Sequence, residues 1–171
     1  MIAVRISPAG AVTCRAAFEL PLAPISVWGQ IRDFSCYARQ DFFHDDPQVE
    51  GIPRRGAAIT LTHRYAALRF RRVGRILVWR EGVGYSFSDL SRRGPRVGFP
   101  HVFSYRIEPL GPDATRLHVV VRGRWTARWI PHLFARLWLW WVFGHVVRSI
   151  RNELLLYRVW RKRHKFASSA G

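Results

Sequence analysis

The stretch FPHVFSYRIEPLGPDATRLHVVVRGRW, residues 99–125, decides the fold. Its first part alternates bulky side chains with other residues and so places on one face Phe99, His101, Phe103, Tyr105 and Ile107. Gly111-Pro112-Asp113 has the composition of a turn. Residues 115–125 then alternate again, with one side carrying Leu117, Val119 and Val121. Because successive residues of a strand point to opposite faces of a sheet, the stretch predicts a β-hairpin with one buried face.

Four segments upstream have the same two-residue period and predict further strands over residues 14–22, 57–65, 70–79 and 85–90. The clearest is 57–65, where one face would carry Ile59, Leu61, His63 and Tyr65. Prolines 21 and 24 and the pair Glu81-Gly82 separate strands as turn residues do. The regular spacing of strands and turns favours an antiparallel meander.

Two regions predict helices. Ser26 is suited to cap a short helix that begins near Val27. Val27, Ile31 and Phe34 keep helical spacing and form its apolar stripe, which Tyr37 would continue. Residues 41–46 predict a second short helix or a loop. No proline interrupts the chain from Pro131, which suits a first helical turn, to about Arg163, so we expect one long C-terminal helix of roughly 45 Å.

The length of 171 residues fits a single domain, expected over residues 1–165 with a frayed tail over 166–171. Hydrophobic residues make up 49% and charged residues 23%, which excludes a disordered or collagen-like chain. We therefore expect an α+β fold. Its antiparallel sheet would have about six to seven strands, with one or two short helices after the first strand and one long C-terminal helix.

The two cysteines, Cys14 and Cys36, allow at most one disulfide, which is typical of a reducing compartment. The first eleven residues lack the long apolar run of a signal peptide. We expect a cytoplasmic protein, with a peripheral location at the inner face of the membrane as an extension of that prediction.

Several short segments resemble the START-like (SRPBCC) superfamily, and in particular its polyketide cyclase/dehydrase or lipid-transport subgroup. They are Phe18-Glu19-Leu20, Pro24-Ile25-Ser26-Val27-Trp28, Ile31-Arg32-Asp33-Phe34, Tyr37, Val49-Glu50-Gly51 with Gly56, and residues 103–117. The resemblance covers about residues 14–157. It implies a helix-grip fold, in which a curved antiparallel sheet is wrapped around the long C-terminal helix, with an apolar cavity between sheet and helix. The family holds ligand carriers, lipid-transfer proteins and a few enzymes without universal catalytic residues, so the resemblance implies no catalytic residue, and we expect no cofactor.

The inward faces of the expected strands are aromatic and apolar, as small-molecule sites are. We expect the ligand-binding residues to be Leu61, His63, Tyr65, Phe87, His101, Phe103, Tyr105, Val119 and Leu137. The alternative is a fully packed core without a usable cavity, because aromatic residues at a two-residue period more often belong to a core.

The candidates for catalysis are His101, His63 and Tyr105, since a histidine beside a tyrosine in an apolar pocket can transfer protons near neutral pH. The competing and favoured interpretation is that both histidines are buried and satisfied by neighbouring groups. The one acidic cluster is Asp41, His44, Asp45 and Asp46. Capping and solvation roles are commoner for such aspartates, so no metal site is predicted.

Residues 137–143 read Leu-Trp-Leu-Trp-Trp-Val-Phe and are apolar around the whole helix, although gripping a sheet needs one apolar face. A transmembrane span is not predicted, because Arg136, His145 and Arg148 bound the run too closely. We expect docking on an anionic membrane or formation of a homodimer through Trp138, Trp141, Arg136 and Arg148. Cover by the arm of residues 1–11 is a further alternative.

The net charge of +17 also raises the possibility of a polyanion partner. Nucleic acid is disfavoured, because no zinc-finger, RNP-type or helix-turn-helix signature accompanies the charge. We therefore expect binding and carriage of a hydrophobic small molecule, either a lipid, an isoprenoid or a polyketide-like compound. The first alternative is a polyketide cyclase or aromatase-like enzyme, although the residues favour a protein that is not an enzyme. The second is a polyanion binder.

Overall fold

The computed structural model describes residues 1–34, 44–65, 68–88, 101–127 and 129–168, without the side chains of 44–46, 63–65, 68, 70 and 158–168. The chain begins with two strands and a short helix, β1 (Ile2–Ile6), β2 (Ala11–Leu20) and α1 (Pro24–Ile31). Three strands follow, β3 (His44–Val49), β4 (Ala58–Tyr65) and β5 (Leu68–Arg80). The last described elements are β6 (Gly84–Ser88), β7 (His101–Gly111), β8 (Ala114–Arg124) and the long helix α3 (His132–Ser168).

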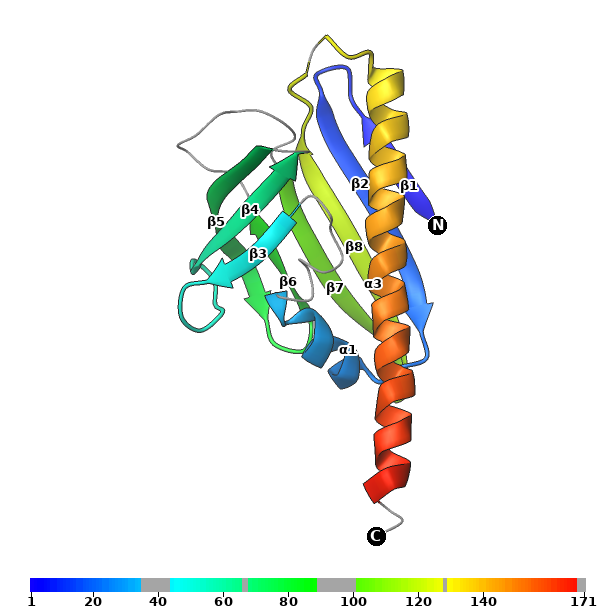
Figure 1. Ribbon diagram of the computed structural model, residues 1–171. Helices are drawn as coiled ribbons and strands as arrows, with labels where there is room; N and C mark the ends of the chain where they lie inside the picture. Colours follow the sequence, from blue (N-terminus) through cyan, green and yellow to red (C-terminus); the bar gives the residue numbers. More distant parts are fainter. Residues whose placement is uncertain (35–43, 66–67, 89–100, 128, 169–171) are drawn as a thin grey trace.

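The strands form one antiparallel sheet of eight strands in the order β1-β2-β8-β7-β6-β5-β4-β3. The sheet curves, and α3 runs along its concave side over β1 and β2, while α1 lies against β7 and β8 (Figure 1). The predicted α+β helix-grip arrangement is confirmed.

Two strands were not predicted, and they bring the expected six to seven up to eight. Residues 2–6, expected as an arm, form β1 and pair with β2, so that their alternating Ile2, Val4 and Ile6 pack against the core. Residues 44–46, expected as helix or loop, belong to β3, which pairs with β4 through an irregularity between Asp45 and Gln48. Both segments are short, and pairing with a neighbouring strand rather than local propensity decides their structure.

The helices begin and end differently from the prediction. The short helix α1 starts at Pro24 without a side-chain cap, so Ser26 lies inside its first turn. A proline at the first helical position has its φ angle already set for the helix, which explains the earlier start. The predicted stripe is confirmed, since Val27, Ile31 and Phe34 are buried, while Tyr37 lies outside the described residues. The long helix begins one residue after Pro131 and continues to Ser168, five residues beyond the predicted end.

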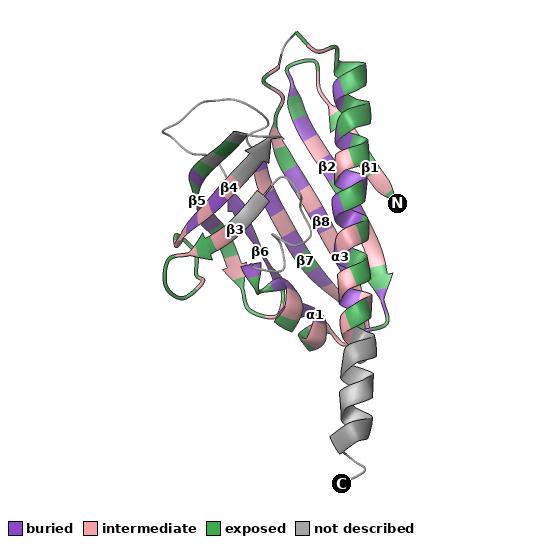
Figure 2. Cartoon of the chain, in the orientation of Figure 1, coloured by how far each residue is buried: buried purple, intermediate pink, exposed green. Residues whose placement is uncertain are grey.

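The hydrophobic core lies between the concave face of the sheet and the inner face of α3 (Figure 2). Along β7 and β8, buried residues alternate with more exposed ones, as the two-residue period predicts. From α3 the core receives six side chains, namely Leu139, Phe143, Val146, Val147, Ile150 and Leu154.

Gly84, which starts β6, lies close to the backbone of β7. Its φ angle is +148°, and a Cβ atom there would overlap the carbonyl oxygen of Tyr105. We expect Gly84→Ala to lower the free energy of unfolding by at least about 2 kcal/mol, measured by urea denaturation. Gly111→Ala is the matched control, because a Cβ atom at Gly111 meets nothing within 4 Å. Equal stability of the two variants would contradict this account.

Candidate functional site

Strand register places aromatic side chains in rows across the concave face of the sheet. One row runs through Val121, Phe103 and Phe87, and the next through Val119, Tyr105 and Tyr85. All six side chains are at most 7% exposed. The alternation of β6, β7 and β8 therefore concentrates aromatic surface in the middle of the sheet, where the strands are paired on both sides.

These rings belong to a larger group that we name the aromatic cluster: Trp28, Phe34, Trp79, Tyr85, Phe87, Phe103 and Tyr105. Phe103 and Tyr105 lie 5.0 Å apart between ring centroids, and Tyr85 and Tyr105 lie 5.3 Å apart. Phe34 connects the sheet to the segment after α1, with its ring 5.0 Å from that of Tyr85. Edge-to-face and offset pairs of this kind each stabilise by about 0.5–1.5 kcal/mol beyond area burial.

Polar groups of the aromatic cluster are satisfied at the α1 end. The Tyr85 hydroxyl donates to the Ile31 carbonyl at 2.7 Å. The Glu81 carboxylate accepts from the indole nitrogens of Trp28 at 2.7 Å and of Trp79 at 3.3 Å. These bonds fix α1 against the β5–β6 turn and hold the tryptophans in place.

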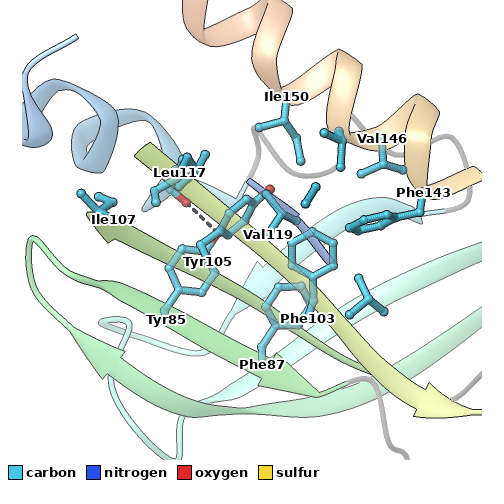
Figure 3. Packing of buried hydrophobic residues seen from close by; sticks show 14 of the residues in the cluster. Tyr85, Phe87, Phe103, Tyr105, Ile107, Leu117, Val119, Phe143, Val146 and Ile150 are labelled. Carbon is cyan, nitrogen blue, oxygen red and sulfur yellow. Dashed lines mark hydrogen bonds between the residues drawn. The ribbon is translucent and has the colours of Figure 1, made fainter. Parts of the chain in front are cut away.

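The long helix closes the other side of the aromatic cluster. Phe143, Val146 and Ile150 point from α3 toward the face that carries Phe103, Tyr105 and Val119 (Figure 3). The side chains of Val146 and Ile150 are 4% and 0% exposed. A group lying between sheet and helix would therefore contact aromatic rings on one side and aliphatic side chains on the other.

Most of the expected ligand-binding residues lie on the concave face. Leu61, Phe87, Phe103, Tyr105 and Val119 are buried there, and His101 joins them at 9% exposure. His63 and Tyr65 lie in β4, paired with Phe70 and Leu68, and their side chains are outside the described part. Whether these residues bind a ligand stays a prediction.

The expectation that Leu137 faces the interior is corrected by the structure. Leu137 is 55% exposed, whereas the buried positions in this part of α3 are Ala135 and Leu139. A run that is apolar around the whole helix gives no information about which side meets the sheet, so the sequence alone could not identify the buried side.

A charged residue on the concave face was missed. Arg72 of β5 pairs in register with Leu61 of β4 and is 9% exposed. In the sequence it stands in a dense group of arginines with Arg69, Arg71 and Arg75. The signal that would have found it is the two-residue period, because Arg72 shares the face of Gly74 and Ile76.

Metal-ligating groups do not gather in the described part of the chain, where no set of three or more His, Cys, Asp or Glu side chains is placed to hold an ion. Asp41 and the side chains of His44, Asp45 and Asp46 lie outside that part, so the structure does not test the acidic cluster.

The residues expected to dock on a membrane or a second copy are exposed on α3. Trp138 and Trp141 are 40% and 54% exposed, and Arg136 and Arg148 are also exposed. The arm of residues 1–11 does not cover them, because residues 2–6 pair with β2 at the sheet edge. Among the described residues, no helix has the length and apolar character needed to span a bilayer.

Comparison with known proteins identifies the fold. No protein-family model and no curated protein matches the sequence. Among solved structures, a START superfamily protein from Mycobacterium smegmatis is similar at a TM-score of 0.65 and 13% identity, over 85% of this chain and 98% of that one. Human STARD10 is similar at 0.64 and 12%, over 95% and 76% of the two chains. The Zhui aromatase/cyclase from Streptomyces sp. R1128 is similar at 0.62 and 15%, over 85% and 92%. The START-like fold implied by the sequence resemblance is confirmed.

The thiol of Cys14 provides a test of how completely water is excluded from the core. Burial raises the pKa of its thiol to about 12, whereas a thiol of an unfolded chain titrates near 8.5. Between these values the unfolded chain loses the proton and the folded protein keeps it, so the stability present below about pH 8.5 falls as the pH rises. In urea denaturation, we expect this thiol to lower the free energy of unfolding by up to about 1.4 kcal/mol for each pH unit above about 8.5.

Cys14→Ala should remove this part of the pH dependence, and Cys36→Ser serves as the control that keeps it. An unchanged slope in Cys14→Ala would mean that the thiol is not buried as described.

Proposed function

We propose that this protein binds and carries a hydrophobic small molecule, such as a lipid, an isoprenoid or a polyketide-like compound, between the concave face of the sheet and α3. We include in the proposal that it exchanges this molecule at an anionic membrane surface. The START-like fold supports this, because the family resemblance implies an apolar ligand at this place.

The observation that carries the proposal is the aromatic cluster facing α3. Seven rings from α1, the segment after it and three strands form one continuous surface. Small-molecule sites are mostly apolar and aromatic, with a small number of polar groups that orient the ligand. Such a surface suits a ligand with flat or branched carbon skeletons, against which aromatic rings pack closely.

Two polar residues on the concave face predict that the ligand has a polar end. Arg72 and His101 are each 9% exposed, on β5 and β7. A guanidinium keeps its charge at every physiological pH, and the interior of a protein strengthens its attraction for an anion. We therefore expect an amphipathic ligand, with its carbon skeleton on the aromatic cluster and its polar end toward Arg72 and His101.

The decisive experiment is native mass spectrometry of gently purified protein, combined with organic extraction of the same sample. We expect a stoichiometric, extractable apolar molecule. Val119→Trp should abolish its retention, because the added indole would lie beside Tyr105, the cross-strand partner of Val119, where we place the ligand. Val120→Trp is the matched control, since Val120 lies on the opposite face of the same strand.

A second variant keeps the test valid if Val119→Trp does not fold. Ala16→Leu fills the same interior from β2, where Ala16 pairs with Val119. Ligand content that stays unchanged in a folded interior variant would refute carriage at this site.

A catalytic role for His101 is the second candidate, favoured by its position on the same face as Phe103 and Tyr105. If the protein is a polyketide cyclase or aromatase, His101→Ala should lower turnover of a polyketide-like substrate by about a hundredfold or more. Substrate binding by the variant is the control that separates chemistry from affinity. Full activity in both His101→Ala and His63→Ala would exclude this role.

A further inference from the structure

The outward side of α3 near its beginning is apolar, although nothing in the described part of the chain buries it. Its large hydrophobic side chains are 40–62% exposed, and Trp129, just before the helix, is 84% exposed. We name this surface the outward apolar face: Trp129, Leu133, Phe134, Leu137, Trp138, Trp140 and Trp141. In Figure 2 the first turns of α3 are largely exposed, in contrast to the turns that follow.

Helical geometry separates this face from the core. Ala135, Leu139 and Phe143 follow one another at four-residue steps and are at most 5% exposed, so they define the side toward the sheet. Phe134, Leu137 and Trp141 lie about half a turn away, at the centre of the outward apolar face. The grip on the sheet therefore does not account for them, and contiguous exposed apolar surface of this kind marks an interaction site.

A cleft of about 260 Å³ adjoins the beginning of this face. Its lining comes from the β1–β2 turn, the end of β8 and the start of α3, and consists of Pro8, Ala9, Gly10, Arg124, Trp125 and His132. The ring of Trp125 lies 5.9 Å from that of Trp138, so the wall of the cleft continues into the outward apolar face. Among the described residues, the lining includes a guanidinium and an imidazole and no acidic group.

The charges around the face favour an anionic partner. Arg136, Arg148 and Arg151 are exposed along the same helix. Over residues 132–151, the part of α3 that includes and adjoins this face, the sequence contains three arginines and no acidic residue. A second copy of the chain would bring the same positive charges together, whereas anionic lipid would neutralise them. Tryptophan is also the side chain most characteristic of the boundary between headgroups and hydrocarbon.

We propose that the outward apolar face inserts into the interfacial region of an anionic phospholipid bilayer, and that the adjoining cleft takes the headgroup of one anionic lipid beside Arg124 and His132. This inference deepens the proposed function, because it names the surface at which the carried molecule would be exchanged. The surface is separate from the aromatic cluster, so ligand binding at the cluster and membrane docking at this face can fail independently.

The test is flotation of the full chain with vesicles of phosphatidylcholine alone and of phosphatidylcholine mixed with phosphatidylserine. We expect binding to the mixed vesicles that weakens as salt is added, and little binding to phosphatidylcholine alone. Replacing Phe134, Leu137 and Trp141 by Gln should reduce binding at least about tenfold. The matched control replaces Ile25, Ile52 and Leu110 by Gln, because these are exposed apolar residues on other parts of the surface.

The cleft is tested by Arg124→Ala combined with His132→Ala, with Arg80→Ala as an exposed arginine on β5 for comparison. We expect the cleft variant to lose several-fold more affinity for the mixed vesicles than the Arg80 variant. Equal losses of affinity in the two variants would refute the headgroup site. The outward apolar face is tested separately, by the triple replacement of Phe134, Leu137 and Trp141.

Oligomeric state is measured on the same samples by native mass spectrometry. A dimer that the triple variant converts to a monomer, together with no binding to either vesicle, would overturn the membrane assignment in favour of self-association. Ligand extraction from the triple variant separates the proposals, since the aromatic cluster is intact in it and its ligand content should match that of the unsubstituted protein.

Discussion

The structure depends on the register that pairs β6 with β7 and β7 with β8. This register aligns Tyr85 with Tyr105 and Val119, and Phe87 with Phe103 and Val121, so that six large side chains share one face. A shift of one residue between β6 and β7 would turn Tyr85 and Phe87 to the outer face and expose their rings to water. The backbone pairing and the burial of aromatic surface therefore support each other, and neither would be stable alone.

The aromatic cluster explains why a short helix can hold its place at the lower end of the sheet. Eight residues make a marginal helix by themselves. Here Trp28 packs on Trp79 at 5.2 Å between centroids, and its indole donates to Glu81. The contact buries an aromatic side chain and satisfies its polar atom at once, which is the condition for placing tryptophan inside a protein.

The long helix serves two surfaces. Its inner side completes the core with Phe143, Val146 and Ile150, and its outer side carries the outward apolar face. A protein that exchanged an apolar molecule at a membrane would need both surfaces. The outer one would contact the bilayer, and the inner one would shield the bound molecule from water. The outward apolar face and the inner wall of the core therefore belong to the same helix.

The sequence alone determined the α+β class, six of the eight strands, the long helix and the inward positions of β7 and β8. Local periodicity carries that information, because a strand repeats every two residues and a helix every 3.6. The tertiary structure decided what periodicity leaves open. It placed Arg72 on the concave face, because the two-residue period groups Arg72 with Gly74 and Ile76, and pairing with Leu61 shows that this group turns inward. It also turned Leu137 outward, because a run apolar on every side has no preferred face until a sheet packs against one of them.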